Sequence, residues 1–273
     1  MLFRSQSIGG GGGYAGAHQA MGYAIPFLLR EGSSGSGGGI TATVESGAAI
    51  RTSGEQAHGL YAQSLGGGGG LIVQLSGLTS AAAEPPKGRA LSKGKGGDIT
   101  ITSAGTIEAL GRDAYAIFAQ SGVQQTDGTL DPGRAGGAIS VTAKGLVAGG
   151  SGAGAAIRID GGGGNTITID ERAVVRAASD RAIVGSFADD RVVNRGTILG
   201  DIDLKGAGAS GVDRVENGAS DWHGALLRTR PDGIIAVGAT GQVLNHAVLD
   251  IGGVGTLART TITGEFRQLA GGR

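Results

Sequence analysis

The sequence predicts an all-β fold made of stacked repeats, namely a parallel β-helix with Gly-rich loops. Three observations predict it. Gly supplies 58 of the 273 residues, about three times its average share of roughly 7%. Related segments recur along the chain, and within them short stretches bounded by Gly alternate apolar and hydroxyl-bearing residues. Such stretches are typical of β-strands.

The composition excludes several other classes of protein. Hydrophobic residues make up 40% of the chain, which is too apolar for a disordered protein. Only 5 residues are Pro, and Gly occurs in runs instead of at every third position, which excludes a collagen triple helix. The 23 basic and 23 acidic residues cancel, so we expect no nucleic-acid partner. Cys is absent, which excludes disulfides and thiolate metal sites.

The repeats carry a common signature. Residues 2–13 read LFRSQSIGGGGG, residues 60–70 read LYAQSLGGGGG and residues 117–122 read IFAQSG. Their aromatic residues are 58 and then 57 positions apart. Self-similarity at such a period indicates a repeat architecture. A second shared element, which begins with Gly-Gly, opens the segments 37–64, 96–121 and, more weakly, 136–160.

Each repeat is predicted to hold three short strands. Ile99–Thr102 alternates apolar and hydroxyl side chains, Thr106–Ala109 follows Gly105, and Ala114–Ala119 follows Gly111. Three strands with short corners suit one coil of a parallel β-helix, with Ile, Val, Leu and Ala inward and Thr, Ser, Glu and Arg outward. A β-sandwich is the alternative all-β fold, but its regularly spaced two-residue hairpins fit these corners less well.

The pattern changes along the chain. Residues 1–160 form a Gly-rich repeat part, and residues 161–273 form a part with more regular coils, giving about ten coils in all. The segment Leu71–Lys95 contains Pro85-Pro86, which cannot donate to a ladder, and is interpreted as a loop outside the coils. The strands expected in the second part lie at 166–169, 173–175, 182–184, 192–198, 201–204, 233–237, 243–249 and 256–262.

Three motifs resemble the passenger region of Gram-negative autotransporter proteins. They are the signature with its Gly run at 60–70, VVNRGTILGDIDL at 192–204, and VLNHAVLDIGGVGTLARTTITGEFRQ at 243–268. The resemblance implies a right-handed parallel β-helix, a pectin-lyase-like solenoid, displayed outside the cell. Residues 1–273 resemble a fragment of such a protein, and we expect the secretion signal and the C-terminal outer-membrane β-barrel to lie outside them.

The resemblance also implies a function. We expect a passenger segment at the outer-membrane surface or in the extracellular medium, acting as a rigid β-helical stalk or adhesin. Its expected partners are host-cell surfaces, extracellular matrix or sister cells. Two alternatives stay open, a β-helical polysaccharide lyase or glycosidase and a pure spacer for an upstream effector domain.

No catalytic, cofactor-binding or metal-binding residue is assigned, and we expect the chain not to be an enzyme. No G-x-S-x-G element is present, and the Gly runs at 9–13 and 66–70 lack the Lys-Ser/Thr end of a phosphate-binding loop. Residues 161–166 are similar to a calcium-binding nonapeptide but have Thr166 where Asp is needed. The four His residues are scattered without ligand spacing, at His18, His58, His223 and His246.

Several polar groups are nevertheless candidates for a role. Carboxylate oxygens for calcium could come from Asp189-Asp190 and from Asp201 with Asp203, although outward charges on coils explain them more simply. A polysaccharide-cleaving cleft would draw on Asp170-Glu171-Arg172 and Asp180-Arg181, which a solvated charged face explains equally well. In the Ala-Gln-Ser signature, Gln63 and Gln120 are expected to form an amide ladder inside a turn.

Overall fold

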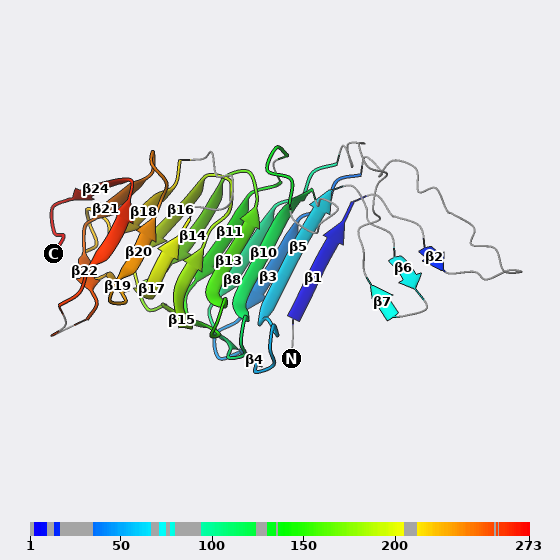
Figure 1. The fold of residues 1–273 in the computed structure, drawn as a ribbon, viewed down its shortest axis with the longest axis horizontal. Helices are drawn as coiled ribbons and strands as arrows, with labels where there is room; N and C mark the ends of the chain where they lie inside the picture. The colour runs from blue at the N-terminus through cyan, green and yellow to red at the C-terminus, as the bar shows by residue number, and fades with distance from the viewer. Residues whose placement is uncertain are drawn as a thin grey trace, which may run out of the picture.

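The chain folds into β-strands that pair almost entirely in parallel (Figure 1). The computed structural model describes residues 3–9, 14–16, 35–66, 71–74, 77–79, 94–123, 130–134, 136–204, 212–253, 255 and 257–273. Among these residues there is no α-helix, and hence none with the length and hydrophobicity that crossing a lipid bilayer requires. The predicted all-β class with parallel strands is confirmed.

One large sheet, called sheet I, has eight parallel strands, of which all but the last, β24, begin a repeat unit. They are β3 (Ile40–Val44), β8 (Ile99–Ser103), β11 (Ile139–Ala143), β14 (Asn165–Ile169), β16 (Asp190–Asn194), β18 (Arg214–Asn217), β21 (Gln242–Asn245) and β24 (Glu265–Gln268).

The other large sheet, called sheet II, has 13 strands in two rows. The first row contains β4 (Ala49–Thr52), β9 (Thr106–Ala109), β12 (Leu146–Gly149), β19 (Leu226–Thr229) and β22 (Val248–Ile251). The second row contains β1 (Phe3–Ile8), β5 (Leu60–Gly66), β10 (Tyr115–Val123), β13 (Ala155–Gly161), β20 (Gly233–Ala236) and β23 (Thr260–Thr263). Two long strands belong to both rows, namely β15 (Val174–Val184) and β17 (Thr197–Asp203).

The chain visits the sheets in a fixed order. It passes from sheet I to the first row of sheet II, then to the second row, and then returns to sheet I, as in β8, β9, β10 and β11. The described residues hold seven such units, which begin at β3, β8, β11, β14, β16, β18 and β21, fewer than the ten coils expected. The return segments vary in length, from 67–98 after β5 to 162–164 after β13, and these lengths reduce the number of units that the chain can form.

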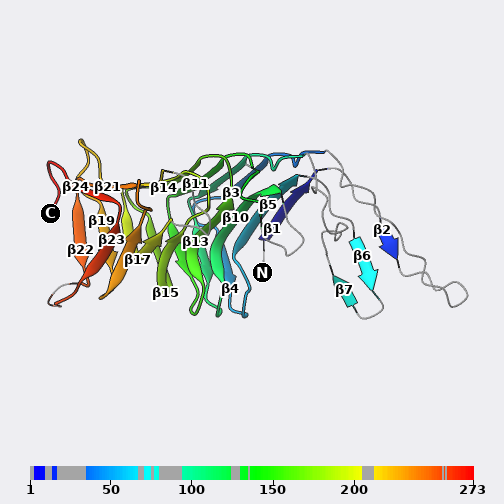
Figure 2. The same cartoon turned by 45° about the horizontal axis from the view of Figure 1, so that its top comes forward.

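The apolar core lies between the sheets, and equivalent positions of successive units lie side by side (Figure 2). In β8, Ile99 and Ile101 are buried while Thr100 between them is exposed, as the period of two predicts. Ile99 lies next to Ile40 of β3 on one side and Ile139 of β11 on the other. A slip by one residue would turn these Ile side chains outward, so burial fixes the register.

Strand β15 differs from the expectation of two separate strands at 173–175 and 182–184. It runs without a break from Val174 to Val184 and bends, with register shifts against β17 around Arg181. The bend lies at Asp180, whose φ is +61°. Non-Gly residues adopt this left-handed conformation only seldom, although Asp is among the more tolerant, and no Gly marks the bend in the sequence.

A small third sheet lies apart from the two large ones beside the N-terminal end of the stack (Figure 1). It contains β2 (Tyr14–Gly16), β6 (Leu71–Gln74) and β7 (Gly77–Thr79). Because β6 and β7 pair only with β2 and with each other, the expectation that Leu71–Lys95 does not join the coils holds for these strands. Pro85 and Pro86 lie outside the described residues.

Candidate functional site

The glutamines of the repeat signature form a ladder across four strands. Gln63 of β5 donates its side-chain amide to Oε1 of Gln120 in β10 at 2.6 Å, and Gln6 of β1 donates to Gln63 in turn. Gln120 donates to Asp160 of β13 at 3.3 Å. Burial raises the pKa of the Asp160 carboxyl, while the Arg158 charge and the bond from Gln120 oppose this rise. The predicted amide ladder is confirmed, on strands instead of in a turn.

The serines of the same signature bind the Gly-Gly elements of their own unit and of the following unit. Ser64 accepts the backbone N–H of Gly97 at 2.8 Å, and Ser121 donates to the Gly97 carbonyl at 2.8 Å. Ser121 also accepts the N–H of Gly137 at 3.0 Å. A Cβ at Gly96 would lie 2.4 Å from the Ser121 Oγ. The Ala-Gln-Ser signature and the Gly-Gly element, the two sequence elements that the repeats share, therefore bind each other. The sequence analysis did not anticipate this contact.

An aromatic ladder with arginines at both ends runs beside the glutamines. Tyr61 and Phe118 occupy the same register position and stack with centroids 4.9 Å apart at 14°. The Arg4 guanidinium covers the other face of Tyr61 at 5.3 Å, and Arg158 covers Phe118 at 5.5 Å. These cation–π contacts occupy the outer ring faces. The ladder therefore stabilises the pairing of β1, β5, β10 and β13 and leaves no ring face open to a ligand.

A second amide ladder lies at the end of the sheet I strands. Asn194 donates to Asn217 at 2.8 Å, Asn217 donates to Asn245 at 2.7 Å, and Asn245 donates to Gln268 at 3.1 Å. The three Asn side chains are fully buried. The sequence analysis missed this ladder, although the recurrence of Val-x-Asn at 192–194, 215–217 and 243–245 is the signal that could have shown it.

Two buried carboxyl groups lie where the second row of sheet II returns to sheet I. We call the cluster of Asn165, Ser186, Asp189, Asp190 and Asp213 the acidic corner. It borders a cavity of about 410 Å³, to which side chains of β16, β18 and β21 also contribute. Of the pairs considered as calcium ligands, Asp189-Asp190 therefore lies beside a cavity.

Within the acidic corner, Asp190 is bound by several donors. Its carboxylate accepts the backbone N–H of Ser186 at 2.5 Å, the Ser186 hydroxyl at 3.0 Å and the Asn165 amide at 2.7 Å. Asp190 is only 1% exposed. Burial outweighs these bonds and raises the pKa of its carboxyl to about 6. Because both oxygens accept hydrogen bonds from residues that precede β16, this carboxylate joins neighbouring units.

Asp213 is the other buried acid of the corner. One of its oxygens accepts the backbone N–H of Asp190 at 2.9 Å, which ties the start of β18 to the start of β16. Burial raises the pKa of the Asp213 carboxyl, and the charges of Asp190, Asp189 and Asp203 add to this rise, so that the pKa reaches about 7 although the bond from the Asp190 N–H opposes it. Asp189 accepts the N–H of Val212 at 2.7 Å. The corner thus favours a protonated Asp213 up to neutral pH.

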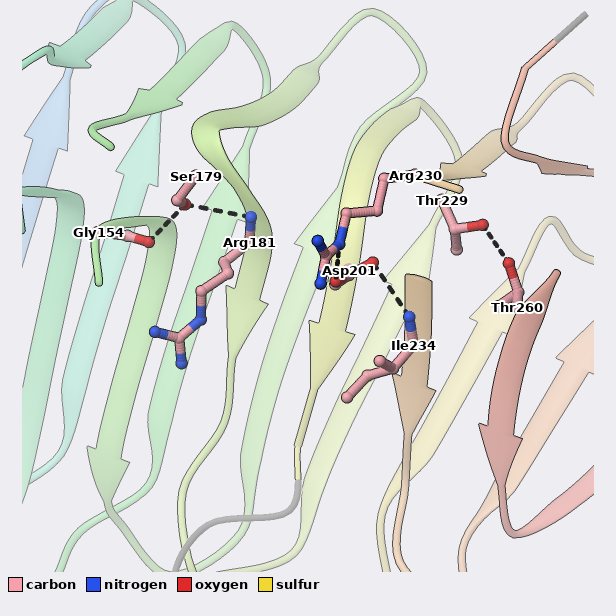
Figure 3. Close-up of polar contacts among 8 residues, drawn as sticks. All are labelled: Gly154, Ser179, Arg181, Asp201, Thr229, Arg230, Ile234 and Thr260. Atoms are coloured by element: carbon pink, nitrogen blue, oxygen red, sulfur yellow. Dashed lines mark hydrogen bonds and ion pairs between the residues drawn. The ribbon is translucent and has the colours of Figure 1, made fainter. Parts of the chain in front are cut away.

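The charged groups considered for a polysaccharide-cleaving cleft do not form one cluster. Arg181 donates its N–H to Ser179, and its guanidinium points away from the Asp201–Arg230 pair (Figure 3). Asp201 accepts Arg230 at 2.9 Å and the N–H of Ile234 at 3.1 Å, so it fastens one corner of sheet II. In the described chain no hydrogen bond or ion pair joins Asp180 or Arg181 to the segment 170–172.

The remaining sequence candidates have local partners. The side chain of Asn165 accepts the N–H of Ile139 at 3.0 Å, so it closes a corner of sheet I. His58 stacks on Tyr115 at 4.9 Å, and His223 bonds to the carbonyl of His246 at 2.7 Å. No group of three or more His, Asp or Glu that could hold a metal ion occurs among the described residues. His18 and the Gly runs at 10–13 and 67–70 lie outside them.

Comparison of the chain with protein families, with curated proteins and with solved structures gives no match.

Proposed function

We propose that residues 1–273 form a right-handed parallel β-helix that acts as a rigid stalk or adhesin, in the manner of an autotransporter passenger. In this proposal the chain is displayed at the surface of a Gram-negative bacterium or secreted from it. The observation that carries the proposal is the stacking of identical side chains in successive units, above all Gln63 on Gln120 and Asn194 on Asn217 on Asn245. Repetition of this kind is typical of solenoid proteins.

The ladders supply the rigidity that a stalk needs. To bend the stack, adjacent units must separate on one side, which would break buried amide bonds such as the one between Asn194 and Asn217. A buried amide that loses its partner costs about 1–3 kcal/mol. Ladders lie in both sheets, at Gln120 in sheet II and at Asn217 in sheet I, so they resist bending in more than one direction.

The β-helical architecture is tested by small-angle X-ray scattering of the purified chain. We expect an elongated particle whose cross-section stays constant along its length, together with a far-UV circular dichroism spectrum dominated by β-structure. A compact, closed particle of equal axes would support a parallel barrel and contradict the stalk.

The adhesive role is tested by attachment of coated beads. Beads that carry the purified chain are offered to host epithelial cells, to extracellular matrix and to cells that display the same chain, with beads carrying an unrelated β-protein as the control. We expect attachment above the control on at least one surface. Background attachment on all three, by protein that keeps its β-spectrum, would contradict an adhesin.

The same preparation distinguishes the stalk from a polysaccharide-active enzyme. The purified chain is incubated with a panel of acidic polysaccharides, and reducing ends and unsaturated uronic ends are measured. The proposal expects no release above a heat-denatured control. Release that is lost in Asp180→Asn or Arg181→Gln would favour the enzyme.

A further inference from the structure

The cavity beside the acidic corner has the size of a small-molecule site. The strands β14, β16, β18 and β21 lie side by side (Figure 1), and each contributes at least one side chain to the lining. The volume of about 410 Å³ falls within the roughly 300–1,000 Å³ of ligand pockets and far exceeds the roughly 30 Å³ of one water molecule. Val212, which also lines the cavity, is 58% exposed, so the cavity is accessible from solvent.

A buried carboxylate in the wall of this cavity has an unused oxygen. Asp213 is 1% exposed and belongs to the lining. One of its oxygens accepts the N–H of Asp190. The other oxygen has no hydrogen-bond or ion-pair partner in the part of the chain that the structure describes. A buried acceptor without a partner costs free energy, so a ligand that donates a hydrogen bond to this oxygen would remove the cost.

Asp189 offers a second unused oxygen close by. One of its oxygens accepts the N–H of Val212, and the other has no partner among the described residues. Asp189 lies near enough for its charge to raise the pKa of the Asp213 carboxyl. The two unused oxygens therefore belong to one electrostatic site.

The cavity also lacks a free cation to balance these acids. Arg191 and Arg214 belong to the lining, but the Glu216 carboxylate already pairs with both guanidinium groups, at 2.8 Å and 2.6 Å. Within the described residues, Asp189 and Asp213 have no ion-pair partner. The missing component of the site is thus a positive charge.

An ammonium group fits this arrangement better than a metal ion does. Calcium takes six or more oxygen ligands, and no three His, Asp or Glu groups among the described residues are placed to hold a metal ion. An ammonium group carries three N–H donors, and Asp213 and Asp189 can accept two of them. The side-chain oxygen of Gln242, which also lines the cavity, or a water molecule can accept the third.

We propose that this cavity binds an alkylammonium ion, whose charge pairs with the carboxylates of Asp213 and Asp189. Val212 and the aliphatic stem of Arg214 belong to the same lining and suit the alkyl chain. The ammonium group comes from a free polyamine or from a lysine side chain of a partner protein. The inference is independent of the proposed stalk, because a stalk without this site would still be rigid.

The proposal is tested by isothermal titration calorimetry of the purified chain at pH 8, above the Asp213 pKa of about 7. The probes are spermidine and Nα-acetyl-lysine methylamide, in about 150 mM NaCl to screen unspecific attraction. We expect saturable binding of at least one probe. Tighter binding of spermidine would assign the site to polyamines, and tighter binding of the lysine derivative would assign it to a lysine side chain. Absence of saturable binding with both probes would overturn the proposal.

Asp213→Asn should weaken binding about tenfold or more, because it removes the buried charge while it keeps an oxygen for the N–H of Asp190. Asp98→Asn is the matched control, since the exposed Asp98 accepts the N–H of Ala138 in the same way, and it should leave the affinity unchanged. Circular dichroism checks that both variants are folded. An equal loss of affinity in the two variants would contradict the site.

A second pair of variants tests the site with both carboxylates in place. Val212→Lys supplies an ammonium group from the chain itself, next to Asp189, and should abolish binding of both probes. Val212→Met keeps the length of an alkyl chain without the charge and should bind them as the native chain does. Equal affinities of the two Val212 variants would overturn the proposal, even if Asp213→Asn did not fold.

Discussion

Gln63 donates its side-chain amide to Oε1 of Gln120 at 2.6 Å, although the two residues are 57 positions apart in the chain. Both side chains are buried, with exposures of 5% and 6%. The Gln63 amide therefore depends on Gln120 for an acceptor that water does not replace. This relation explains why the repeat keeps Gln at the same place while its aromatic neighbour varies between Tyr61 and Phe118.

Replacement of Gln120 by Leu should lower the free energy of unfolding by about 2 kcal/mol, because the buried Gln63 amide loses its acceptor. Urea unfolding followed by far-UV circular dichroism measures the change. Gln6→Leu is the matched control, since Gln6 is exposed at the end of the same ladder, and it should cost less than about 0.5 kcal/mol. Equal losses in the two variants would contradict the ladder's role.

Replacement of Gly96 by Ala should destabilise the protein by about 3 kcal/mol through overpacking. The new Cβ would lie 2.4 Å from both the Ser121 Oγ and the backbone N of Gly122. Ser121→Ala in the same chain removes only the first clash, so it should rescue only part of the loss. The control is Gly47→Ala, where φ is +82° and no atom lies within 4 Å; its cost should be about 1 kcal/mol, from backbone strain alone.

Replacement of Asn217 by Leu should destabilise the C-terminal units by about 2–4 kcal/mol, because both Asn194 and Asn245 lose a partner. The single Trp of the chain, Trp222, donates its indole N–H to the Arg195 carbonyl at 2.8 Å, so its fluorescence reports on this region. The midpoint of urea unfolding by fluorescence should fall in the variant. An unchanged midpoint would show that the Asn ladder adds no stability.

The acidic corner should make the protein less stable as the pH rises. The pKa values of Asp190 and Asp213 in the folded chain are about 6 and about 7, above the usual value of roughly 4. The folded state therefore binds more protons than the unfolded state between about pH 4 and pH 7, so the free energy of unfolding falls across this range. Thermal unfolding at a series of pH values measures the slope.

Asp213→Asn should flatten this pH dependence and stabilise the protein at pH 8 by about 2 kcal/mol. Asn keeps an oxygen that accepts the N–H of Asp190, but it carries no charge. Asp98→Asn is the control, because the exposed Asp98 accepts the N–H of Ala138 at 2.8 Å in a similar way. If the Asp213 variant kept the wild-type slope of stability against pH, the assignment of this pH dependence to Asp213 would be refuted.

Removal of the Asp201 carboxylate should cost about 2 kcal/mol in Asp201→Ala, because the N–H of Ile234 and the Arg230 guanidinium lose their acceptor. Arg181→Ala should change stability by less than about 0.5 kcal/mol, since its side chain makes a single exposed contact, with the Ala153 carbonyl at 3.2 Å. Comparison of the two melting temperatures tests whether the Asp201 carboxylate, and not the Arg181 side chain, fastens this corner of sheet II (Figure 3).

Local patterns predicted the strands well. The alternation of apolar and polar residues at 99–102 and 106–109 corresponds to β8 and β9. Every second residue of these strands is buried, and the apolar residues of the sequence stand at the buried positions. The continuous β15 was not predicted, because Arg176 to Arg181 holds no large apolar residue and the bend at Asp180 has no Gly to mark it. Local signals thus fail where neighbouring strands impose the conformation.

Contacts between units were harder to predict than strands. The Gln63–Gln120 pair was foreseen because the same three-letter signature surrounds both residues. The bond between Ser121 and Gly137, and the approach of Asp213 to Asp190, each join a side chain to a backbone N–H, and no shared sequence signature marks the two partners. That register is a property of the folded stack, and a single sequence does not reveal it.

The unequal return segments have a practical consequence. Between β13 and β14 the return takes only residues 162–164, whereas 32 positions, 67–98, separate β5 from β8, and the strands on either side still pair in register. The ladders, not the returns, set the register, so this edge accepts added sequence without change to its neighbours. The exposed Gly163-Gly164 step is accordingly a natural acceptor for a grafted epitope or a small guest domain, carried at a defined height on the stack.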